Sequence, residues 1–415
     1  MKRIGIVESN RSGSGFDTLR AARALGLHVT FFSSGLDRYH ATPGGTEVLD
    51  GCVDEFVACP THELEPLLEA VKAVDAYAPL DALLSVAEYE VVQTAEAARQ
   101  LGLPGPDPAA IRMARNKAAQ RRRWAETEVP IPAFRVVTTA ADAVAAASEV
   151  GFPCVVKAVD ETSGTHVVRC PDPDAVRSTF AAIRAQTTNR RGQPRAAEVL
   201  VEECLVGFEV SVEILASAGG VRVLGVTDKI LGGRNRFVEL GHSFPTALPD
   251  GVRAALEAAA VAATTAVGFD LGIAHVELKY TAEGPKLIEI NPRPAGDRIT
   301  ELMDRSLGLS TMELLIRQYL GEPAPAPTAP VGGAAIRYLT AKPGVVESVS
   351  GVEIAAAVPG VLEAVAAVAP GSRVGALRVN EDRVGHVLAT APDPYLAGRI
   401  AEAAAQQIVV ATRHG

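Results

Sequence analysis

The segment KLIEINPRPAGDR (286–298) ends an apolar strand and then places carboxylate, amide and guanidinium groups close together. The loop TAEGP before it is centred on Glu283. In a symmetric hairpin folded around Glu283, Glu277 faces Glu289 because both lie at the same distance from the centre. Opposed residues share one face of an antiparallel pair, with Cβ atoms about 5 Å apart. The sequence therefore predicts two carboxylates side by side.

Two ionised carboxylates cannot stay together on apolar strands unless a cation lies between them or one keeps its proton. Asn291 follows Glu289 by two positions, so it lies on the same face and offers a carbonyl oxygen. Mg²⁺ prefers such oxygen ligands and commonly shares phosphate oxygens. The pattern favours a Mg²⁺ site formed by Glu277, Glu289 and Asn291, with Mn²⁺ as a possible substitute. A solvated sheet face in another register is the alternative.

Two lysines and a polar loop are suited to phosphate binding. Lys157 ends the strand CVVK, and the loop 160–165 after it can present backbone N–H groups to phosphate oxygens. Lys117 lies in the basic segment 109–126, which has the pattern of one helix. Each feature also has a plainer interpretation, as an ordinary hairpin with a surface lysine and as a solvated helix face.

The composition limits the kind of protein. The chain has 415 residues, 48% of them hydrophobic, which predicts two or three domains. Its formal net charge of -9 argues against nucleic acid as a partner. The five cysteines form no CxxC pair, which favours buried thiols in a reducing compartment. We see no signal peptide and no apolar run near the ~20 residues of a membrane span, so we expect a cytoplasmic protein.

The element pattern predicts how these residues are positioned. Residues 3–34 read as a βαβ unit that opens a parallel sheet. Its loop SGSG (12–15) does not complete GxGxxG, so a tight strand-to-helix turn is the better interpretation than a dinucleotide site. LPGPDP (103–108) marks a first boundary and GEPAPAPTAP (321–330) a second. Between the boundaries, residues 197–230 alternate with a period of two, typical of antiparallel strands.

The ordered motifs resemble the ATP-grasp superfamily of ATP-dependent carboxylate ligases, and the resemblance covers essentially the whole chain. It rests on AEYEVVQTAEAARQLGLPG, GFPCVVKAVDETSGTHVV, VLVEECLVGFEVSVEIL, HVELKY and IEINPRPAG. The tail from AAIRYLTAKPG onward is similar to the C-terminal domain of biotin-carboxylase-like members. The resemblance implies a mixed α/β and α+β chain with the ATP-grasp fold and a homodimer. Its parts would be a Rossmann-like N-terminal domain (1–106), a two-lobed ATP-grasp domain (107–325) and a small α+β C-terminal domain (326–415).

The resemblance also implies roles for individual residues. Arg293 would neutralise the acyl phosphate and the tetrahedral intermediate, and Mg²⁺ would sit on the predicted carboxylate pair. The residues that would contact ATP are Lys117 and Lys157 for the phosphates, Ser163, Gly164 and Thr165 in the loop over them, Glu202, Glu203 and Leu205 around the adenine, and Glu209 for the ribose. Asn116 stands where many relatives have Asp, and the loop 160–165 is short and poor in glycine.

Within the superfamily, the segment 226–249 and the sequence NPRPAGDR resemble L-amino-acid ligases, which join two unprotected amino acids. The implied reaction forms an acyl phosphate from a carboxylate and ATP, and an amine then displaces phosphate. Lys229 and His242 would reach the γ-phosphate or a substrate carboxylate, with a packing role for His242 as the alternative. Gly296, Asp297 and Arg298 would border the substrate pocket. Asp297 either pairs with a substrate ammonium or forms a salt bridge to Arg293 or Arg298.

Other functions remain open on the sequence. A biotin carboxylase is weaker, because the chain has no biotinyl carrier region and its glycine loop differs. A regulator that binds nucleotide without catalysis is disfavoured by the metal carboxylates together with Arg293. A dinucleotide oxidoreductase, suggested by SGSG, would need a hydride acceptor site that nothing later in the chain supplies.

Overall fold

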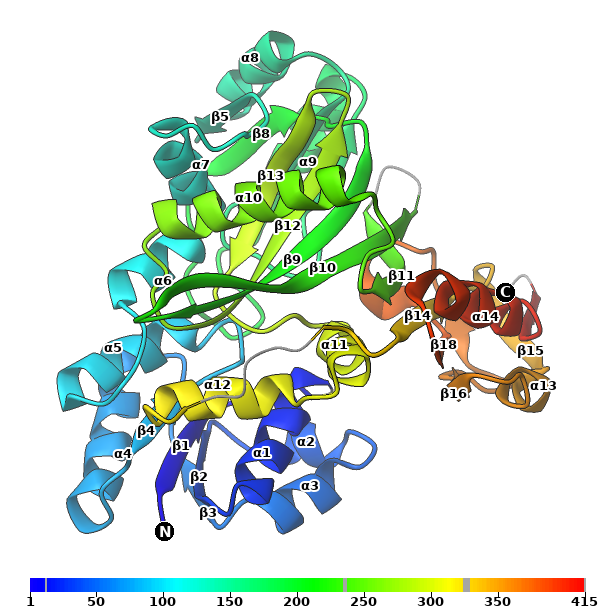
Figure 1. The fold of residues 1–415 in the computed structure, drawn as a ribbon. Helices are drawn as coiled ribbons and strands as arrows, with labels where there is room; N and C mark the ends of the chain where they lie inside the picture. The colour runs from blue at the N-terminus through cyan, green and yellow to red at the C-terminus, as the bar shows by residue number, and fades with distance from the viewer. Residues whose placement is uncertain (12, 234–236, 324–328, 414–415) are drawn as a thin grey trace.

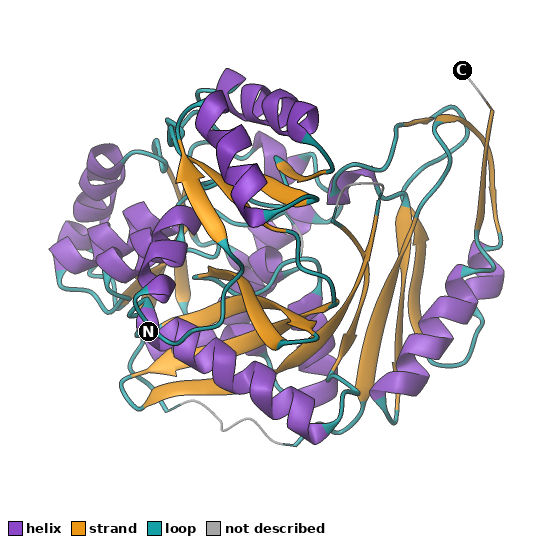
Figure 2. Ribbon diagram, turned by 90° about the horizontal axis from the view of Figure 1, so that it is seen from above, coloured by secondary structure: helices purple, strands orange, loops and turns teal. Residues whose placement is uncertain are grey.

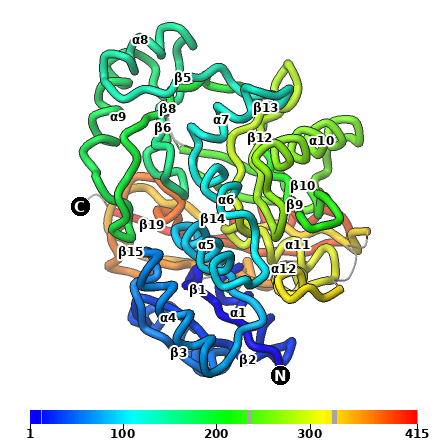
Figure 3. The backbone as a smooth tube through the Cα atoms, turned by 90° about the vertical axis from the view of Figure 1, so that its left-hand side faces the viewer, coloured from blue at the N-terminus to red at the C-terminus, as the bar shows by residue number. Residues whose placement is uncertain are grey.

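The computed structural model describes the chain except residues 12, 234–236, 324–328 and 414–415. In Figure 1 the N-terminal domain lies at the bottom, a small lobe at the top and the C-terminal segment at the right, around one large sheet. Figure 3, turned by 90°, again places the small lobe and the N-terminal domain at opposite ends. None of the described helices is both long and apolar enough to cross a membrane.

The N-terminal domain is a parallel four-stranded sheet in the order β3-β2-β1-β4. The predicted βαβ unit is confirmed, because β1 and β2 pair in parallel on either side of α1. The domain consists of β1 Arg3–Val7, α1 Ser14–Ala24, β2 His28–Ser33, α2 Asp37–His40, α3 Gly45–Cys52, β3 Glu55–Ala58, α4 Leu64–Tyr77, β4 Ala82–Leu84 and α5 Val91–Leu101.

The loop between β1 and α1 is a tight turn, as expected. Gly13 adopts a φ of 53°, which favours glycine. A Cβ on Gly15 would lie 2.0 Å from the carbonyl oxygen of Asn10. These glycines therefore let the chain turn closely into α1. Ser12 of the same motif lies outside the described residues.

The small lobe is an antiparallel sheet in the order β5-β8-β6-β7. The single helix expected over 109–126 is wrong: two helices meet at Asn116, whose side chain accepts a hydrogen bond from the Ala119 N–H and begins the second helix at Lys117. The helices and strands here are α6 Pro108–Ala114, α7 Lys117–Ala125, β5 Phe134–Val137, α8 Ala140–Val150, β6 Cys154–Ala158, β7 Val167–Cys170, α9 Pro173–Ala185 and β8 Val199–Glu203.

The large sheet has eight described strands in the order β13-β12-β9-β10-β11-β14-β18-β16. Helix α10 packs on one face over a core of apolar side chains, and helices follow the outer side of the curved sheet in Figure 2. The elements are β9 Phe208–Ser217, β10 Gly220–Gly232, β11 Val238–Phe244, α10 Asp250–Ala266, β12 Gly272–Thr281, β13 Gly284–Asn291, α11 Ile299–Leu307 and α12 Thr311–Tyr319.

The C-terminal segment continues the large sheet, because β14 pairs with β11 and β18 with β14. It adds a three-stranded sheet, β17-β15-β19. The domain boundary expected at 325/326 lies outside the described residues, and the one at 106/107 stays a prediction. The elements are β14 Gly333–Leu339, β15 Gly344–Ser350, α13 Val352–Ala356, β16 Val361–Ala366, β17 Arg373–Val374, η1 Asn380–Asp382, β18 Gly385–Ala391, α14 Pro394–Ala405 and β19 Val409–Arg413.

The hairpin β12–β13 has the predicted pairing but a different turn. Thr281 pairs with Gly284, so the turn is tighter than the five-residue loop expected from the sequence. That register alone would place Glu277 opposite Ile288. A β-bulge between Glu277 and Leu278 shifts the pairing and sets Glu277 opposite Glu289. The predicted carboxylate pair is therefore confirmed, and the bulge creates it.

Candidate active site

One face of the large sheet is polar because charged residues occupy alternate positions along neighbouring strands. Along β12 these residues are His275, Glu277 and Lys279. The residues between them, Val276 and Leu278, are buried in the core shared with α10. The alternation therefore separates a structural face from a face that can hold ligands.

A row of four charged or ionisable residues crosses this polar face. The strand register sets Lys279 of β12 beside Glu209 of β9, and Glu209 beside Lys229 of β10. Lys229 in turn lies beside His242 of β11. Directly opposed residues share a face. Pairing of the strands thus brings together three residues that the sequence had singled out separately: Glu209, Lys229 and His242.

The Lys229 ammonium lies at the centre of three carboxylates. Its Nζ is 2.6 Å from Oε1 of Glu239, 3.0 Å from Oε1 of Glu277 and 3.5 Å from Oε1 of Glu209. Burial disfavours the charged amine, but these carboxylates hold the pKa of Lys229 well above its usual value. For Glu209, burial outweighs the nearby lysines and raises the pKa to about 7. Lys229 is therefore a fixed cation within the site.

Glu277 is oriented by two cationic donors. Its Oε1 atom lies 3.0 Å from Lys229 Nζ and 3.0 Å from His275 Nε2. His275 Nδ1 lies 2.8 Å from Glu213, and the two carboxylates raise the imidazole pKa to about 10 against the effect of burial. Burial would raise the pKa of Glu277, but Lys229 and His275 hold it well below its usual value. No partner is recorded for its Oε2 among the described residues, so this oxygen is available to a metal ion.

Glu289 and Asn291 complete the predicted metal set. Glu289 Oε2 is 2.9 Å from Lys117 Nζ, and its Oε1 accepts a hydrogen bond of 3.0 Å from the Asn291 amide nitrogen. This leaves the Asn291 carbonyl oxygen without a recorded partner in the described part of the chain. Lys117 also donates to the Glu161 carbonyl oxygen at 2.7 Å. The three oxygen-bearing side chains are close neighbours, and each of the two carboxylates already pairs with a lysine.

Lys157 is held on the small lobe by Glu202. Its Nζ lies 2.6 Å from Glu202 Oε2, and the other carboxylate oxygen pairs with Arg121. Burial lowers the pKa of Lys157, although Glu202 acts in the opposite direction. The Glu203 carboxylate accepts a 3.2 Å hydrogen bond from the Ala133 N–H. The two carboxylates assigned to the adenine thus have protein partners, which leaves backbone groups of this segment for a purine.

Arg293 is fixed by a residue that the sequence analysis did not single out. Its Nε donates to Glu88 Oε2 at 2.9 Å, and Arg115 pairs with the same carboxylate. Burial would raise the pKa of Glu88, but the two guanidiniums lower it to about 2. Glu88 therefore stays ionised and orients the Arg293 guanidinium at the cavity wall.

Asp297 forms a salt bridge, but with neither of the partners considered from the sequence. Both of its carboxylate oxygens pair with Arg383, and Oδ2 lies 2.8 Å from His242 Nε2. The Tyr338 hydroxyl donates to its backbone carbonyl at 2.7 Å. The expected salt bridge from Asp297 to Arg293 or Arg298 is wrong. His242 of β11 and Arg383 of the C-terminal segment pair with the Asp297 carboxylate instead.

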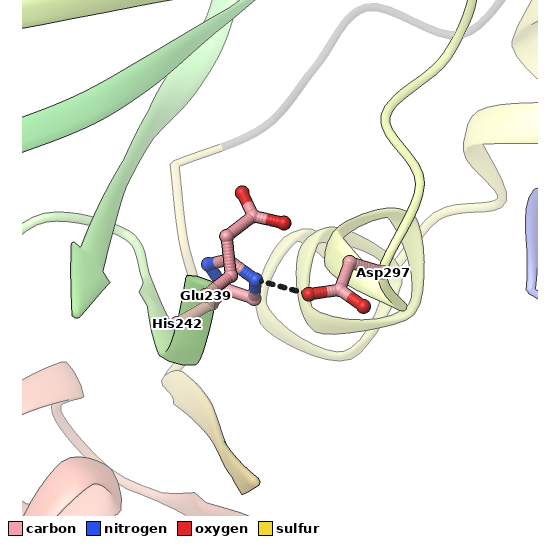
Figure 4. Close-up of side chains that lie close together, drawn as sticks. All are labelled: Glu239, His242 and Asp297. Atoms are coloured by element: carbon pink, nitrogen blue, oxygen red, sulfur yellow. Dashed lines mark hydrogen bonds and ion pairs between the residues drawn. The ribbon is translucent and has the colours of Figure 1, made fainter. Parts of the chain in front are cut away.

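Arg298 faces away from this group. It pairs with Glu301 at 2.8 Å and with Glu363 of β16. Figure 4 shows instead that His242 and Asp297 point toward each other, with Glu239 beside them. One ligand atom from each of these three residues lies within 4.8 Å of the others, which a metal ion would allow. Arg383 and Lys229 already neutralise the two carboxylates, so the group forms a charged pocket wall without an ion.

These groups line one cavity of about 930 Å³. All of the predicted site residues contribute to its lining except Thr165, His242 and Arg298. Thr165 lies at the end of the loop whose other members, Ser163 and Gly164, do contribute. The cavity therefore joins the residues assigned to phosphates, metal and substrate into one continuous space.

Sequence reasoning missed Glu88, Glu239, His275 and Arg383. His275 could have been found, because it lies two positions before Glu277 and so shares its face. Glu88 stands in AEYE, which the analysis used for the resemblance without assigning the carboxylate. Arg383 gives no local signal, since only the folding of the C-terminal segment against β11 brings it to Asp297.

Comparisons with family models divide the chain in a consistent way. A model described as an ATP-grasp domain matches residues 150–301, and one described as an ATP-grasp N-terminal domain matches residues 19–105. Residues 337–413 match L-amino acid ligase C-terminal domain 2. The matched ranges include Glu277, Glu289 and the other residues of the polar sheet face.

Solved and curated proteins agree with this division. The L-amino acid ligase from Bacillus licheniformis has a TM-score of 0.81 at 22% identity, covering 100% of this chain and 99% of that one, which confirms the expected fold. The uncharacterized protein y4rH of Sinorhizobium fredii is 28% identical over 98% of this chain and 83% of its own length. Carnosine synthase 1 of Gallus gallus is 29% identical over 75% of this chain, which covers only 34% of that protein.

Proposed function

Because the chain belongs to the ATP-grasp superfamily, we propose that it is an ATP-dependent ligase that joins a carboxylate to an amine and releases ADP and phosphate. The observation that carries the proposal is the pair Glu277 and Glu289, set side by side by a β-bulge and faced by Lys229 and Lys117. Such a set suits phosphoryl transfer, in which the protein mainly positions groups and balances charge.

ATP would lie between the small lobe and the large sheet. Lys157 and Lys117 line the cavity and would contact phosphate oxygens, with Ser163 and Gly164 above them. Thr165 would support that loop. The backbone around Glu202, Glu203 and Leu205 would frame the adenine, and Glu209, near the start of β9, would accept the ribose hydroxyls.

The residues present fit Mg²⁺ because their free ligand atoms are oxygens. Glu277, Glu289 and Asn291 would hold it, and His275 with Lys229 fixes which Glu277 oxygen faces outward. When bound, the ion would supply positive charge for the β- and γ-phosphates. Lys117 is placed to share in that neutralisation, since it already lies 2.9 Å from Glu289.

The proposed chemistry has two steps. The substrate carboxylate attacks the γ-phosphorus of ATP and forms an acyl phosphate with ADP as the leaving group. Arg293 would stabilise the negative charge on the acyl phosphate and then on the tetrahedral intermediate, since Glu88 holds it in place. Lys229 would attract the substrate carboxylate or the γ-phosphate. His242, bonded to Asp297 beside them, would support this wall of the pocket.

We propose amino acids as substrates. The proteins to which this chain is similar include an L-amino acid ligase and carnosine synthase 1. In this chain, Asp297 and Glu239 form an acidic wall at the cavity, and Gly296 leaves room beside it. An ammonium group on the carboxylate substrate would bind there, next to the carboxylates that Arg383 and Lys229 now share. Arg298 would support this turn from behind, and the homodimer expected from the resemblance remains part of the proposal.

The test is a screen of amino-acid pairs for ADP release, with mass spectrometry of the products. We expect ADP formation that requires a carboxylate substrate, together with a condensed product lighter than the sum of the pair by one water. Hydroxylamine added in place of the amine should trap the acyl phosphate as a hydroxamate. ATP binding without carboxylate-stimulated ADP release or hydroxamate would contradict the ligase and favour a nucleotide-binding regulator.

A further inference from the structure

Glu90, at the N-terminal-domain end of the cavity, is a buried carboxylate to which no described residue donates a hydrogen bond. Only 1% of its side chain is exposed, yet it contributes to the cavity lining. Neither carboxylate oxygen accepts a hydrogen bond from the described residues. Its recorded ion pair is with Arg191, whose Nε lies 3.3 Å from Oε1.

This arrangement is costly for the protein alone. A buried carboxylate normally accepts several hydrogen bonds, and one that does not is destabilised in its charged form. Burial accordingly raises the pKa of Glu90 to about 7; Arg191, Arg38 and Arg115 oppose the shift, and Glu8 adds to it. A cationic ligand group that reaches these unpartnered oxygens would remove this cost.

Arg191 stands on a strap whose tip lines the cavity. The strap, residues 187–195, is a short hairpin closed by the pairing of Thr188 with Pro194. Gln193 ties it to the turn that carries Glu90, because its amide donates to the Tyr89 carbonyl oxygen at 3.1 Å. The strap thus holds Arg191 over Glu90, although the two residues come from different domains.

The Arg191 guanidinium also has unused donors. Only Nε contacts Glu90, and no hydrogen bond or ion pair is recorded for its two terminal nitrogens among the described residues. Arg11 lines the same end of the cavity and likewise has no recorded partner in the described chain. Among the described residues, this end therefore has a carboxylate without hydrogen-bond donors next to guanidinium nitrogens without recorded partners. That is the complement of a molecule with an ammonium and a carboxylate close together.

We propose that this end of the cavity binds the amine substrate as an α-amino acid zwitterion, with its ammonium on Glu90 and its carboxylate on Arg191. The inference rests on the proposed ligase function and assigns the residues that hold the second amino acid. The Asp297 wall is already assigned to the ammonium of the carboxylate substrate, so the amine substrate needs a site of its own.

In the second step, the amine substrate displaces phosphate from the acyl phosphate. The substrate ammonium gives one proton to Glu90, and the neutral amine attacks the acyl carbon. The new carbon–nitrogen bond forms as the carbon–oxygen bond to phosphate breaks, with the electron pair leaving on the phosphate. The departing phosphate takes the second nitrogen proton, and Glu90 returns its proton to water. Glu90 thereby both binds the amine and makes it nucleophilic.

The experiment compares two nucleophiles in the purified full-length chain. The first is hydroxylamine, which is small, neutral and has no carboxylate. The second is a panel of proteinogenic amino acids, each tested beside its α-carboxamide. For the wild type we expect each accepted amino acid to exceed its carboxamide at least tenfold in kcat/KM. In Arg191→Gln this preference should disappear, through a rise in KM for the free amino acid.

For Glu90→Gln, the ratio of amide to hydroxamate formation should fall at least tenfold, since only the amino acid needs a base and an ammonium site. Arg135→Gln is the matched control, because it removes an exposed ion pair with Glu149 outside the cavity. Unchanged preference and ratio in both variants, in an enzyme that makes hydroxamate, would overturn the inference alone. A wild type that makes neither product would overturn the ligase proposal itself. If Glu90→Gln does not fold, Arg191→Gln, on the half-exposed strap, decides the matter.

Discussion

The two ends of the cavity treat buried carboxylates differently. At the end formed by the large sheet, Glu239, Glu277 and Glu289 each lie within 3.0 Å of a lysine ammonium. At the N-terminal-domain end, Glu90 has one arginine at 3.3 Å and no hydrogen-bond donor among the described residues. Charge at the sheet end is thus balanced before any ligand arrives, whereas the other end leaves a place for a ligand's own cation.

Glu8 shows that burial alone does not explain why Glu90 lacks hydrogen-bond donors among the described residues. Glu8 is fully buried in the same domain, yet it accepts hydrogen bonds from Thr61 Oγ1 at 2.8 Å and from the Ser34 N–H at 2.9 Å, and it pairs with Arg38 and Tyr39. Burial would raise its pKa, but these partners lower it to about 2. The fold can satisfy a buried carboxylate here, so the lack of donors at Glu90 is a property of that position.

We expect the largest loss of activity from a change to a carboxylate of the proposed metal site. Glu289→Gln keeps the size of the side chain but removes the charge that balances Lys117 and would hold Mg²⁺. We expect carboxylate-dependent ADP release to fall about 1,000-fold, as for the loss of one preorganised electrostatic group. Glu283→Gln, at the exposed tip of the same hairpin, should keep its activity. Full activity of a folded Glu289→Gln variant would remove the site assignment.

Glu8 has protein partners but no proposed ligand, so its substitution should lower the free energy of unfolding rather than the activity. Shifting a carboxyl pKa from 4.5 to about 2 corresponds to about 3 kcal/mol of folding free energy at neutral pH. We expect Glu8→Gln to lose about that amount at pH 7, measured by urea unfolding. The folded-state pKa is lowered, so the loss should shrink as pH falls from 4.5 toward 2. A loss that stays constant across that range would show that charge is not its cause; Glu63→Gln, which is exposed, is the control.

The sequence predicted the sheet end better than the N-terminal-domain end, for a physical reason. Glu277, Glu289 and Asn291 lie on a hairpin, where local periodicity already fixes which side chains share a face. Even there the turn was wrong, and the pairing survived because a bulge compensated. Glu90 and Arg191 come from separate domains, and only the folded strap brings them together. No local pattern carries that information.

The partner of Asp297 could not be predicted from local periodicity either, because Arg383 comes from the C-terminal segment. If Asp297 recognises an ammonium, Asp297→Asn should lower kcat/KM about tenfold for carboxylate substrates that carry an amino group, relative to those that lack one. Arg383→Gln should retain or strengthen this preference, because it frees the carboxylate. An equal fall in both variants for every substrate would instead identify the salt bridge as a purely structural contact.

The smallest effect, and the sharpest contrast with Glu8, concerns the stability of Glu90→Gln. The pKa of Glu90 is raised to about 7, so the folded state holds its proton more tightly than the unfolded chain. Wild-type stability should therefore decline as pH rises from 4.5 to 7, and the variant should lack this contribution. Since the new amide is itself short of partners, we expect a net gain of only about 1 kcal/mol at pH 8. In urea unfolding from pH 4.5 to 8, the free energy of unfolding of the variant should rise relative to that of the wild type. The Glu8→Gln variant should instead become less stable than the wild type as pH rises through its own range. A variant that loses ground as pH rises would mean that Glu90 has donors in solution and is not open to a ligand.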